Sequence, residues 1–161
     1  MENTMVSHPF EFVELGAEQL NLIRELWEKL NAHHVDLAPD FAARRRRRTF
    51  DIRLQEWRDI ARAGQLKIDF VKTIGGRPIA YCVTTLTAQL DGEIDSLFVD
   101  PDVRGQGVGS ELMRRGLAWL SACGAKSKLI VVAHGNEKAL GFYARFGFKP
   151  NTIHLREPDF E

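Results

Sequence analysis

Cysteine is scarce in this chain of 161 residues, and the two that occur, Cys82 and Cys123, lie far apart. Neither belongs to a C-x-x-C pair or has the spacing of a zinc site. A reduced, cytoplasmic protein is therefore the simplest expectation.

An excess of charge and long apolar runs are also absent. The chain carries 22 Lys and Arg against 22 Asp and Glu, so the formal net charge is zero, which argues against nucleic acid as an obligatory partner. The longest apolar runs fall far short of the roughly 20 residues of a membrane span, so we expect no membrane partner. Residues 1–12 lack a basic segment followed by an apolar one, and we expect no signal peptide.

Length and composition are those of an ordinary globular domain. A chain of this length can bury a sizeable core, and 44% hydrophobic with 27% charged residues is typical of folded domains. We therefore expect one domain over residues 1–161.

The most informative stretch, residues 93–120, reads as a strand, a glycine-rich turn and a helix. Residues 93–99 alternate in character, and Pro101 ends this strand because it offers no N–H to a ladder. Three glycines then fall within five residues, and apolar side chains recur at helical spacing from Val108. The pattern predicts a helix that begins near Gly107.

A turn of this kind can bind an anion. The N–H groups of a helix's first turn have no intrahelical partner, and the dipole adds about half a positive charge there. Glycines allow a large anion to approach the backbone closely. We therefore expect a phosphate or pyrophosphate ligand, with Arg104 beside it.

The glycine spacing narrows the choice of ligand. A dinucleotide fingerprint needs G-x-G-x-x-G and a P-loop needs Gly-Lys-Ser/Thr, whereas this turn is G-x-G-x-G. Arg104, Gly107 and Gly109 instead fill R-x-x-G-x-G, directly after a strand that ends at Val99. Here the chain resembles the GCN5-related N-acetyltransferase (GNAT) family, whose pyrophosphate-binding motif has that spacing. A tight turn with incidental glycines is the alternative.

A second motif carries the same resemblance. Residues 136–148 read NEKALGFYARFGF and are similar to the family's N-x-x-A-x-x-F-Y-x-x-x-G-F segment. The resemblance implies that Asn136 bonds the pantetheine arm and that Tyr143 lies near the thioester sulfur, as the acid that protonates the thiolate. The alternative for Tyr143 is a core aromatic whose hydroxyl finds a backbone acceptor. Phe142 and Phe146 are expected to pack.

The order of elements is also that of the family. We expect an α/β (α+β) fold with a mixed central sheet, in the order β-α-α-β-β-β-α-β-α-β. The strands are expected at residues 10–15, 66–73, 79–86, 93–99, 129–133 and 152–155. The run at 129–133 is wholly apolar, as a buried parallel strand would be. The exposed edge of 152–155 could pair with a second copy in a homodimer.

The resemblance implies acetyl-CoA as cosubstrate. The two parallel strands would part after their shared start, the pantetheine would pair with the freed edge of the central strand, and an N–H of that strand would face the developing oxyanion. No metal is expected, because the adjacent His33 and His34 point to different sides of a helix and lack a third ligand. The expected cofactor-binding residues are Leu97, Phe98, Val99, Arg104, Gly105, Gln106, Gly107, Val108, Gly109, Ser110 and Asn136.

The base is the least determined part of the predicted site. Some family members carry a glutamate where this chain has Val131 and Val132. Others use an acid on the central strand, which corresponds here to Asp95, with Glu93 on the same face. Asp95 or Glu93 could act directly or through water, bulk water could deprotonate the amine, or Asp95 could be a salt-bridged acid.

The sequence does not name an acceptor. The region of the two N-terminal helices offers acids, which would hold a cationic amine, and arginines, which would hold an acidic one. We expect the arginine run 44–48 to be a solvated helix, although a nucleic-acid or anionic-substrate patch is the alternative. The acids expected to pair with it are Asp40, Asp51, Glu56 and Asp59, and the other polar residues of this region are His33, His34 and Asp36.

The predicted activity is direct transfer of an acetyl group from acetyl-CoA to a primary amine of a small molecule or peptide, in a ternary complex. One alternative is a catalytically weak CoA-binding sensor of the same fold. The other is a nucleotide-dependent redox enzyme, which the glycine spacing disfavours.

Overall fold

The computed structural model describes residues 9–158, so most of the segment on which we expected no signal peptide lies outside the described residues. No helix of the described part is long and apolar enough to cross a bilayer. The strands are β1 (Phe10–Leu15), β2 (Gln65–Thr73), β3 (Pro78–Leu86), β4 (Asp91–Val99) and β5 (Ser127–Leu129). The helices are α1 (Arg24–Leu37), α2 (Ala42–Arg47), α3 (Phe50–Ala63), α4 (Val108–Ala122) and α5 (Lys138–Ala144), and short 3-10 turns span Ala17–Ile23, Pro39–Phe41 and Pro101–Val103.

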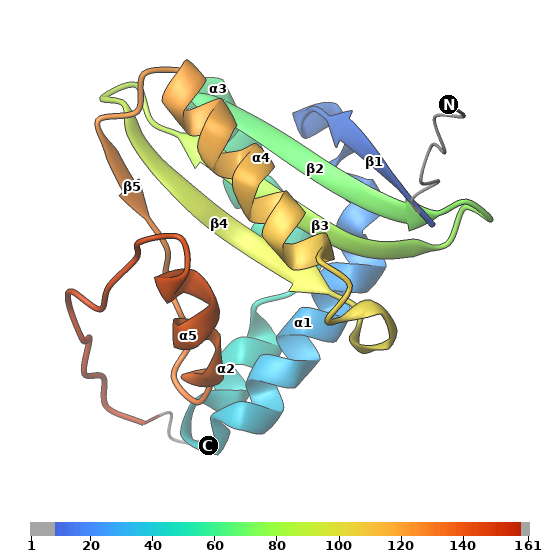
Figure 1. Cartoon of the computed structure of the whole chain (residues 1–161). Helices are drawn as coiled ribbons and strands as arrows, with labels where there is room; N and C mark the ends of the chain where they lie inside the picture. Colours follow the sequence, from blue (N-terminus) through green and yellow to red (C-terminus); the bar gives the residue numbers. More distant parts are fainter. Residues whose placement is uncertain (1–8, 159–161) are drawn as a thin grey trace, which may run out of the picture.

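The five strands form one mixed sheet in the order β1-β2-β3-β4-β5 (Figure 1). Neighbours from β1 to β4 are antiparallel, and β5 joins β4 in parallel. The predicted hairpin turn between β2 and β3 is confirmed, with Gly76 at a φ of +90°. Helices α1 and α3 pack on one face around Trp27 and Trp57, whereas α4 covers the other with Leu112 and Met113. The sheet is thus buried on both faces.

The pairing between β4 and β5 is short. Only Asp91–Glu93 and Ser127–Leu129 are in register. Beyond Glu93 the edge of β4 has no strand partner within residues 9–158, because the chain after β5 turns away from the sheet. The two parallel strands therefore part after a shared start, as the family resemblance implied.

Two predicted strands are wrong. The strand expected at 129–133 is instead Ser127–Leu129 and is exposed, and residues 130–133 have no regular structure. Residues 152–155 are also irregular, with Ile153 84% exposed and Leu155 93% exposed. Side chains that favour strands form one only beside an edge that accepts their hydrogen bonds. The strand edge that we expected to pair with a second copy is therefore not formed.

A buried ion pair lies between the sheet and α4. Lys67 Nζ lies 2.9 Å from Asp69 Oδ2, and the two residues are 6% and 1% exposed. Lys67 Nζ also donates to the carbonyl of Arg115 in α4 at 3.5 Å. Burial raises the pKa of Asp69, while the Lys67 ammonium opposes that rise. Each charge is therefore tolerated in the core because of the other.

Candidate active site

The turn between β4 and α4 has the predicted form. Gly105 and Gly107 have φ angles of +76° and +83°, in the left-handed region that favours glycine. Gly107 is the N-cap, so the helix begins at Val108, as expected. A Cβ at either glycine would meet no atom within 4 Å, so no side chain fills the turn.

The backbone N–H groups of this turn are uncommitted. The N–H groups of Val103 and Arg104 bond to the carbonyls of Asp100 and Pro101, but those of residues 105–110 have no acceptor within residues 9–158. Arg104 lies beside them, and its Nε donates to the carbonyl of Val99 at 2.9 Å. Unpaired donors at the positive end of a 15-residue helix form a site for an anion.

The open edge of β4 continues from this turn. The Asp100 N–H donates to the carbonyl of Ile79 in β3 at 2.8 Å. Since successive residues of a strand direct their N–H groups to opposite edges, those of Leu97 and Val99 face the open side, and that of Phe98 faces β3. The edge can therefore accept an extended chain, with the Leu97 N–H available to an oxygen.

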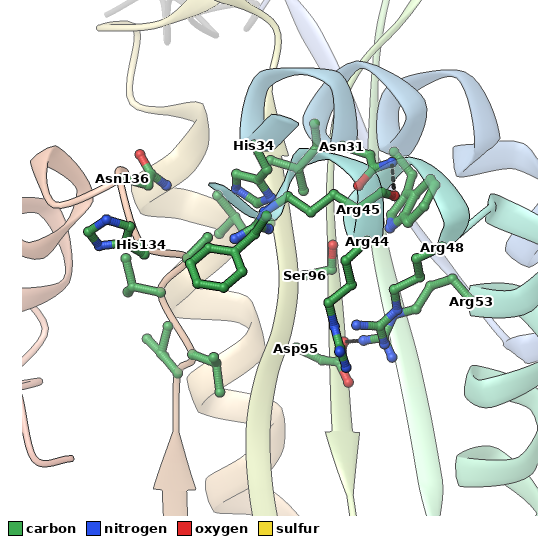
Figure 2. Close-up of a pocket in the computed structure, with 18 of the residues that line it drawn as sticks. Asn31, His34, Arg44, Arg45, Arg48, Arg53, Asp95, Ser96, His134 and Asn136 are labelled. Carbon is green, nitrogen blue, oxygen red and sulfur yellow. Dashed lines mark hydrogen bonds and ion pairs between the residues drawn. The ribbon is translucent and has the colours of Figure 1, made fainter. Parts of the chain in front are cut away.

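A cleft of about 850 Å³ opens beside this edge (Figure 2). One wall is the chain after β5, where Figure 2 shows His134 and Asn136, and the other carries side chains of α1, α2 and α3. Of the predicted site residues, the cleft brings together Asp95, Leu97, Asn136 and Tyr143. The glycine turn lies outside this lining, beyond the end of β4.

Tyr143 keeps its proton at ordinary pH. Burial, helped by the nearby Cys82, raises the pKa of Tyr143 to about 12. Its ring packs on Phe142, with the centroids 5.2 Å apart. Its hydroxyl has no hydrogen-bond partner among the residues that the structure describes, so the backbone acceptor of a purely structural tyrosine is not seen there. The hydroxyl is therefore available as a donor.

Asp95 occupies a bulge in β4. Val83 pairs with Ser96 and Thr84 with Ile94, which leaves Asp95 as an extra residue. A bulge can bring two consecutive side chains to one face. Here Asp95 and Ser96 both point to the side covered by α1 and α3.

The Asp95 carboxylate is already engaged. Trp57 Nε1 donates to its Oδ1 at 3.0 Å, and Arg53 forms an ion pair with the same oxygen (Figure 2). Sequence reasoning missed both partners, which lie about 40 residues upstream; their i,i+4 spacing on one helix face was the available signal. Burial raises the pKa of Glu93, and the charge of Asp95 adds to this rise while Arg53 opposes it. Glu93 does not line the cleft.

The arginine run is largely exposed, as expected of a solvated helix, but it also lines the cleft. Among residues 9–158, six arginines and two carboxylates line the cleft, and four of these arginines are Arg44, Arg45, Arg47 and Arg48 of the run. Of the acids expected to pair with it, Glu56 binds Arg48 at 2.5 Å, whereas Asp51 binds Arg24 and Asp59 binds Arg62. The run therefore supplies one wall of the cleft.

Of the other polar residues expected near the acceptor, His34 and Asp36 each line a hollow, whereas His33 lines neither. His34 lines the cleft, and its ring lies 6.1 Å from that of His33. Asp36 lines a separate, smaller hollow near α2. Within residues 9–158, no three His, Cys, Asp or Glu side chains gather closely enough to hold a metal ion.

Comparison with known proteins finds relatives of this chain. Residues 24–148 match the Acetyltransferase (GNAT) family. A peptidyl-lysine N-acetyltransferase of Salmonella typhimurium is 44% identical over 61 residues, which are 37% of this chain and 39% of that protein. The chain matches less than half the length of such curated relatives.

Solved structures share the fold. A GCN5-related N-acetyltransferase from Ralstonia eutropha superposes with a TM-score of 0.67 at 21% identity, over 91% of this chain and 97% of that one. AAC(6')-Iy in complex with the bisubstrate analogue CoA-S-monomethyl-acetylneamine gives a TM-score of 0.66 at 18% identity, over 95% and 100%.

Proposed function

Because the chain belongs to the acetyltransferase (GNAT) family, we propose that it transfers an acetyl group from acetyl-CoA to a primary amine of a small molecule or peptide. The observation that carries this proposal is the row of uncommitted N–H groups at residues 105–110, which opens beside the free edge of β4. A diphosphate on that turn would leave the pantetheine to run along β4 into the cleft.

The donor would be held by backbone as much as by side chains. Residues 105–110 and Arg104 would bind the diphosphate, and Leu97 and Val99 would pair with the pantetheine like an added strand. Asn136 would reach it from the opposite wall of the cleft. The structural neighbour that carries a CoA-based bisubstrate analogue supports this class of donor.

The chemistry needs three groups. The Leu97 N–H would stabilise the oxyanion that forms when the amine attacks the thioester carbonyl, in a ternary complex. Tyr143 would donate its proton to the departing thiolate, so that a thiol leaves and an amide forms. Asp95 would take a proton from the attacking amine, directly or through water, and we assign this role to Oδ2 because both protein contacts fall on Oδ1.

Calorimetric titration of acetyl-CoA into the wild-type protein and Gly107→Ala tests the donor site. An alanine at a φ of +83° is strained by about 1–2 kcal/mol, and its Cβ would occupy the approach of the diphosphate. We expect Kd to rise at least about tenfold, which corresponds to 1.4 kcal/mol.

Gly76→Ala is the matched control for this titration. Gly76 also has a positive φ, of +90°, with open space around its Cβ, but it lies in the β2–β3 hairpin. The two variants should lose similar stability, while only Gly107→Ala loses affinity. Absence of heat with the wild-type protein would refute the proposed acetyl-CoA site. Equal affinity in all three proteins would show that the glycine turn is not part of that site.

Asp95→Asn tests the base through the pH dependence of kcat. If Asp95 takes the proton, turnover falls at neutral pH and recovers at high pH, where the amine deprotonates without help. If Glu93 is the base, its pKa falls when the charge of Asp95 is removed, so the acidic limb moves to lower pH. Glu93→Gln then abolishes that limb. If both variants showed the same pH dependence of kcat as the wild type, neither Asp95 nor Glu93 would be the base.

The second candidate function is a CoA-binding sensor without turnover. It is favoured by the two contacts that already occupy Asp95 Oδ1, and by valines where some family members carry a glutamate. Thiol release with a panel of primary amines separates the two. Tight acetyl-CoA binding with no release across the panel would establish the sensor.

A further inference from the structure

The acids of the cleft are not available to a cationic substrate. Asp95 is paired with Arg53, and Glu56 Oε2 lies 2.8 Å from Arg53 and 2.5 Å from Arg48. Within the part of the chain that the structure describes, these are the two carboxylates that line the cleft. A second positive charge on the acceptor would therefore have to displace an arginine to find a partner.

Arg45 differs from these paired arginines. Figure 2 shows its side chain running from α2 into the cleft toward His34. Its Nε is buried and has no hydrogen-bond partner, and no ion pair with an acid is found for it within residues 9–158. Burial and the charge of Arg48 lower the pKa of Arg45, although a guanidinium stays protonated in proteins. The result is a partly buried cation with an unused donor.

The surroundings hold Arg45 in place. The Asn31 amide donates to the Arg45 carbonyl at 3.1 Å, which ties α2 to α1 at this residue (Figure 2). Burial, then the charges of Arg45 and His33, lower the pKa of His34 to about 4, so its imidazole is neutral near pH 7. Arg45 thus keeps its charge in the cleft beside a neutral neighbour.

We propose that the acceptor carries, besides its amine, a carboxylate or phosphate group that binds the Arg45 guanidinium. This inference rests on the proposed function and narrows its substrate class. The planar fork of arginine fits the oxygens of either group, and an unpaired buried donor gains a partner when such a group enters. The diphosphate of the donor is not the anion concerned, because its turn precedes α4, on the face of the sheet opposite to α1 and α3.

The test uses acceptor pairs that differ only in the anionic group. α-Amino acids are compared with their decarboxylated amines, and O-phosphoethanolamine with ethanolamine, by thiol release from acetyl-CoA. We expect kcat/KM of the wild-type protein to be at least about tenfold higher for the anionic member of one pair type, which identifies the group as carboxylate or phosphate. Arg45→Met should remove that preference by raising KM for the anionic member far more than for the neutral member.

Arg46→Met is the matched control. Arg46 lies on the same helix and is exposed, but it does not line the cleft. It should keep the preference intact. Arg45→Met should melt no lower than the wild type, because it exchanges a buried unpaired charge for an apolar stem. Loss of the preference in Arg46→Met to the same degree would overturn the inference.

The remaining outcomes separate this inference from the proposed function. Turnover without preference for an anionic acceptor, or preference for the neutral members, would overturn the anion subsite and leave the acetyltransferase intact. If no acceptor turns over, the same pairs are titrated into the CoA-loaded protein. Binding of an anionic member that Arg45→Met abolishes would still support the subsite, and no binding of any anionic member would overturn it.

Discussion

Replacing Lys67 with methionine is expected to lower the free energy of unfolding by about 3–5 kcal/mol, because it leaves Asp69 as a buried charge without its partner. Asp69 is 1% exposed, and Lys67 Nζ at 2.9 Å is its counter-charge. Water cannot reach the carboxylate to replace the ammonium. Urea unfolding at neutral pH measures the loss as a lower midpoint with an unchanged slope.

Two control variants and the pH dependence identify the cause. Lys72→Met breaks a partly exposed ion pair between Lys72, also in β2, and Glu11 of β1, and should cost less than about 1 kcal/mol. The double variant Lys67→Met/Asp69→Leu, with both charges gone, should regain most of the stability.

Burial raises the pKa of Asp69 above its unfolded value. Its protonated form therefore stabilises the folded state at low pH, and that contribution is lost as pH rises through the folded pKa. The deficit of Lys67→Met should accordingly shrink on acidification. A deficit below 1 kcal/mol at neutral pH, or one independent of pH, would contradict this account.

Tyr143→Phe is expected to lower kcat by about 10²-fold, the low end of the range for general acid catalysis, with the Kd for acetyl-CoA nearly unchanged. Burial raises the pKa of Tyr143 to about 12, so the hydroxyl remains protonated up to alkaline pH and can serve the thiolate throughout. Turnover assays between pH 7 and 9 measure the decrease in kcat. A phenylalanine keeps the ring contact with Phe142, so the fold should be retained.

Tyr81→Phe is the control for this loss, since Tyr81 is the other tyrosine of the chain. Its hydroxyl is bonded to Ser96 Oγ at 2.8 Å in the core, so its removal should cost about 1–3 kcal/mol of stability and leave kcat near the wild-type value. If Tyr143→Phe retains full kcat, the thiolate takes its proton from elsewhere and Tyr143 is a packing residue.

The parts of the fold that the sequence predicted are those specified locally. The hairpin at Gly75-Gly76 and the helix start at Gly107 each follow from backbone conformations that few other residues adopt. The strand expected at 129–133 failed because it depends on a distant edge: β4 accepts only three residues of β5 before the two diverge. The strand expected at residues 152–155 is absent for the same reason, since no strand edge within the described chain pairs with these residues.

The site was predictable to the same extent. The R-x-x-G-x-G turn was located from its spacing, and Tyr143 was named through the family resemblance. The turn has open space at Gly105 and Gly107, and burial raises the pKa of Tyr143, whereas the roles of both stay predictions. The partners of Asp95 and the position of Arg45 could not be predicted, because they depend on how α3 packs on the sheet and how α2 packs on α1. Charge counting alone treated the arginine run as balanced by its neighbours, whereas burial separates Arg45 from them.

The three-residue seam between β4 and β5 has a consequence for how the protein holds together. Helix α5 contains no fully buried side chain from Lys138 to Ala144, and Phe142, Tyr143, Phe146 and Phe148 pack only partly buried against the core, so this flank is joined to the rest by that seam and a few partly buried aromatic contacts. A donor molecule lying in the gap would contact both flanks and act as a strut between them. Resistance to heat and to proteases would then rise with the donor concentration by mass action. The protein would be more stable in a cell with a high donor concentration than in one with a low concentration.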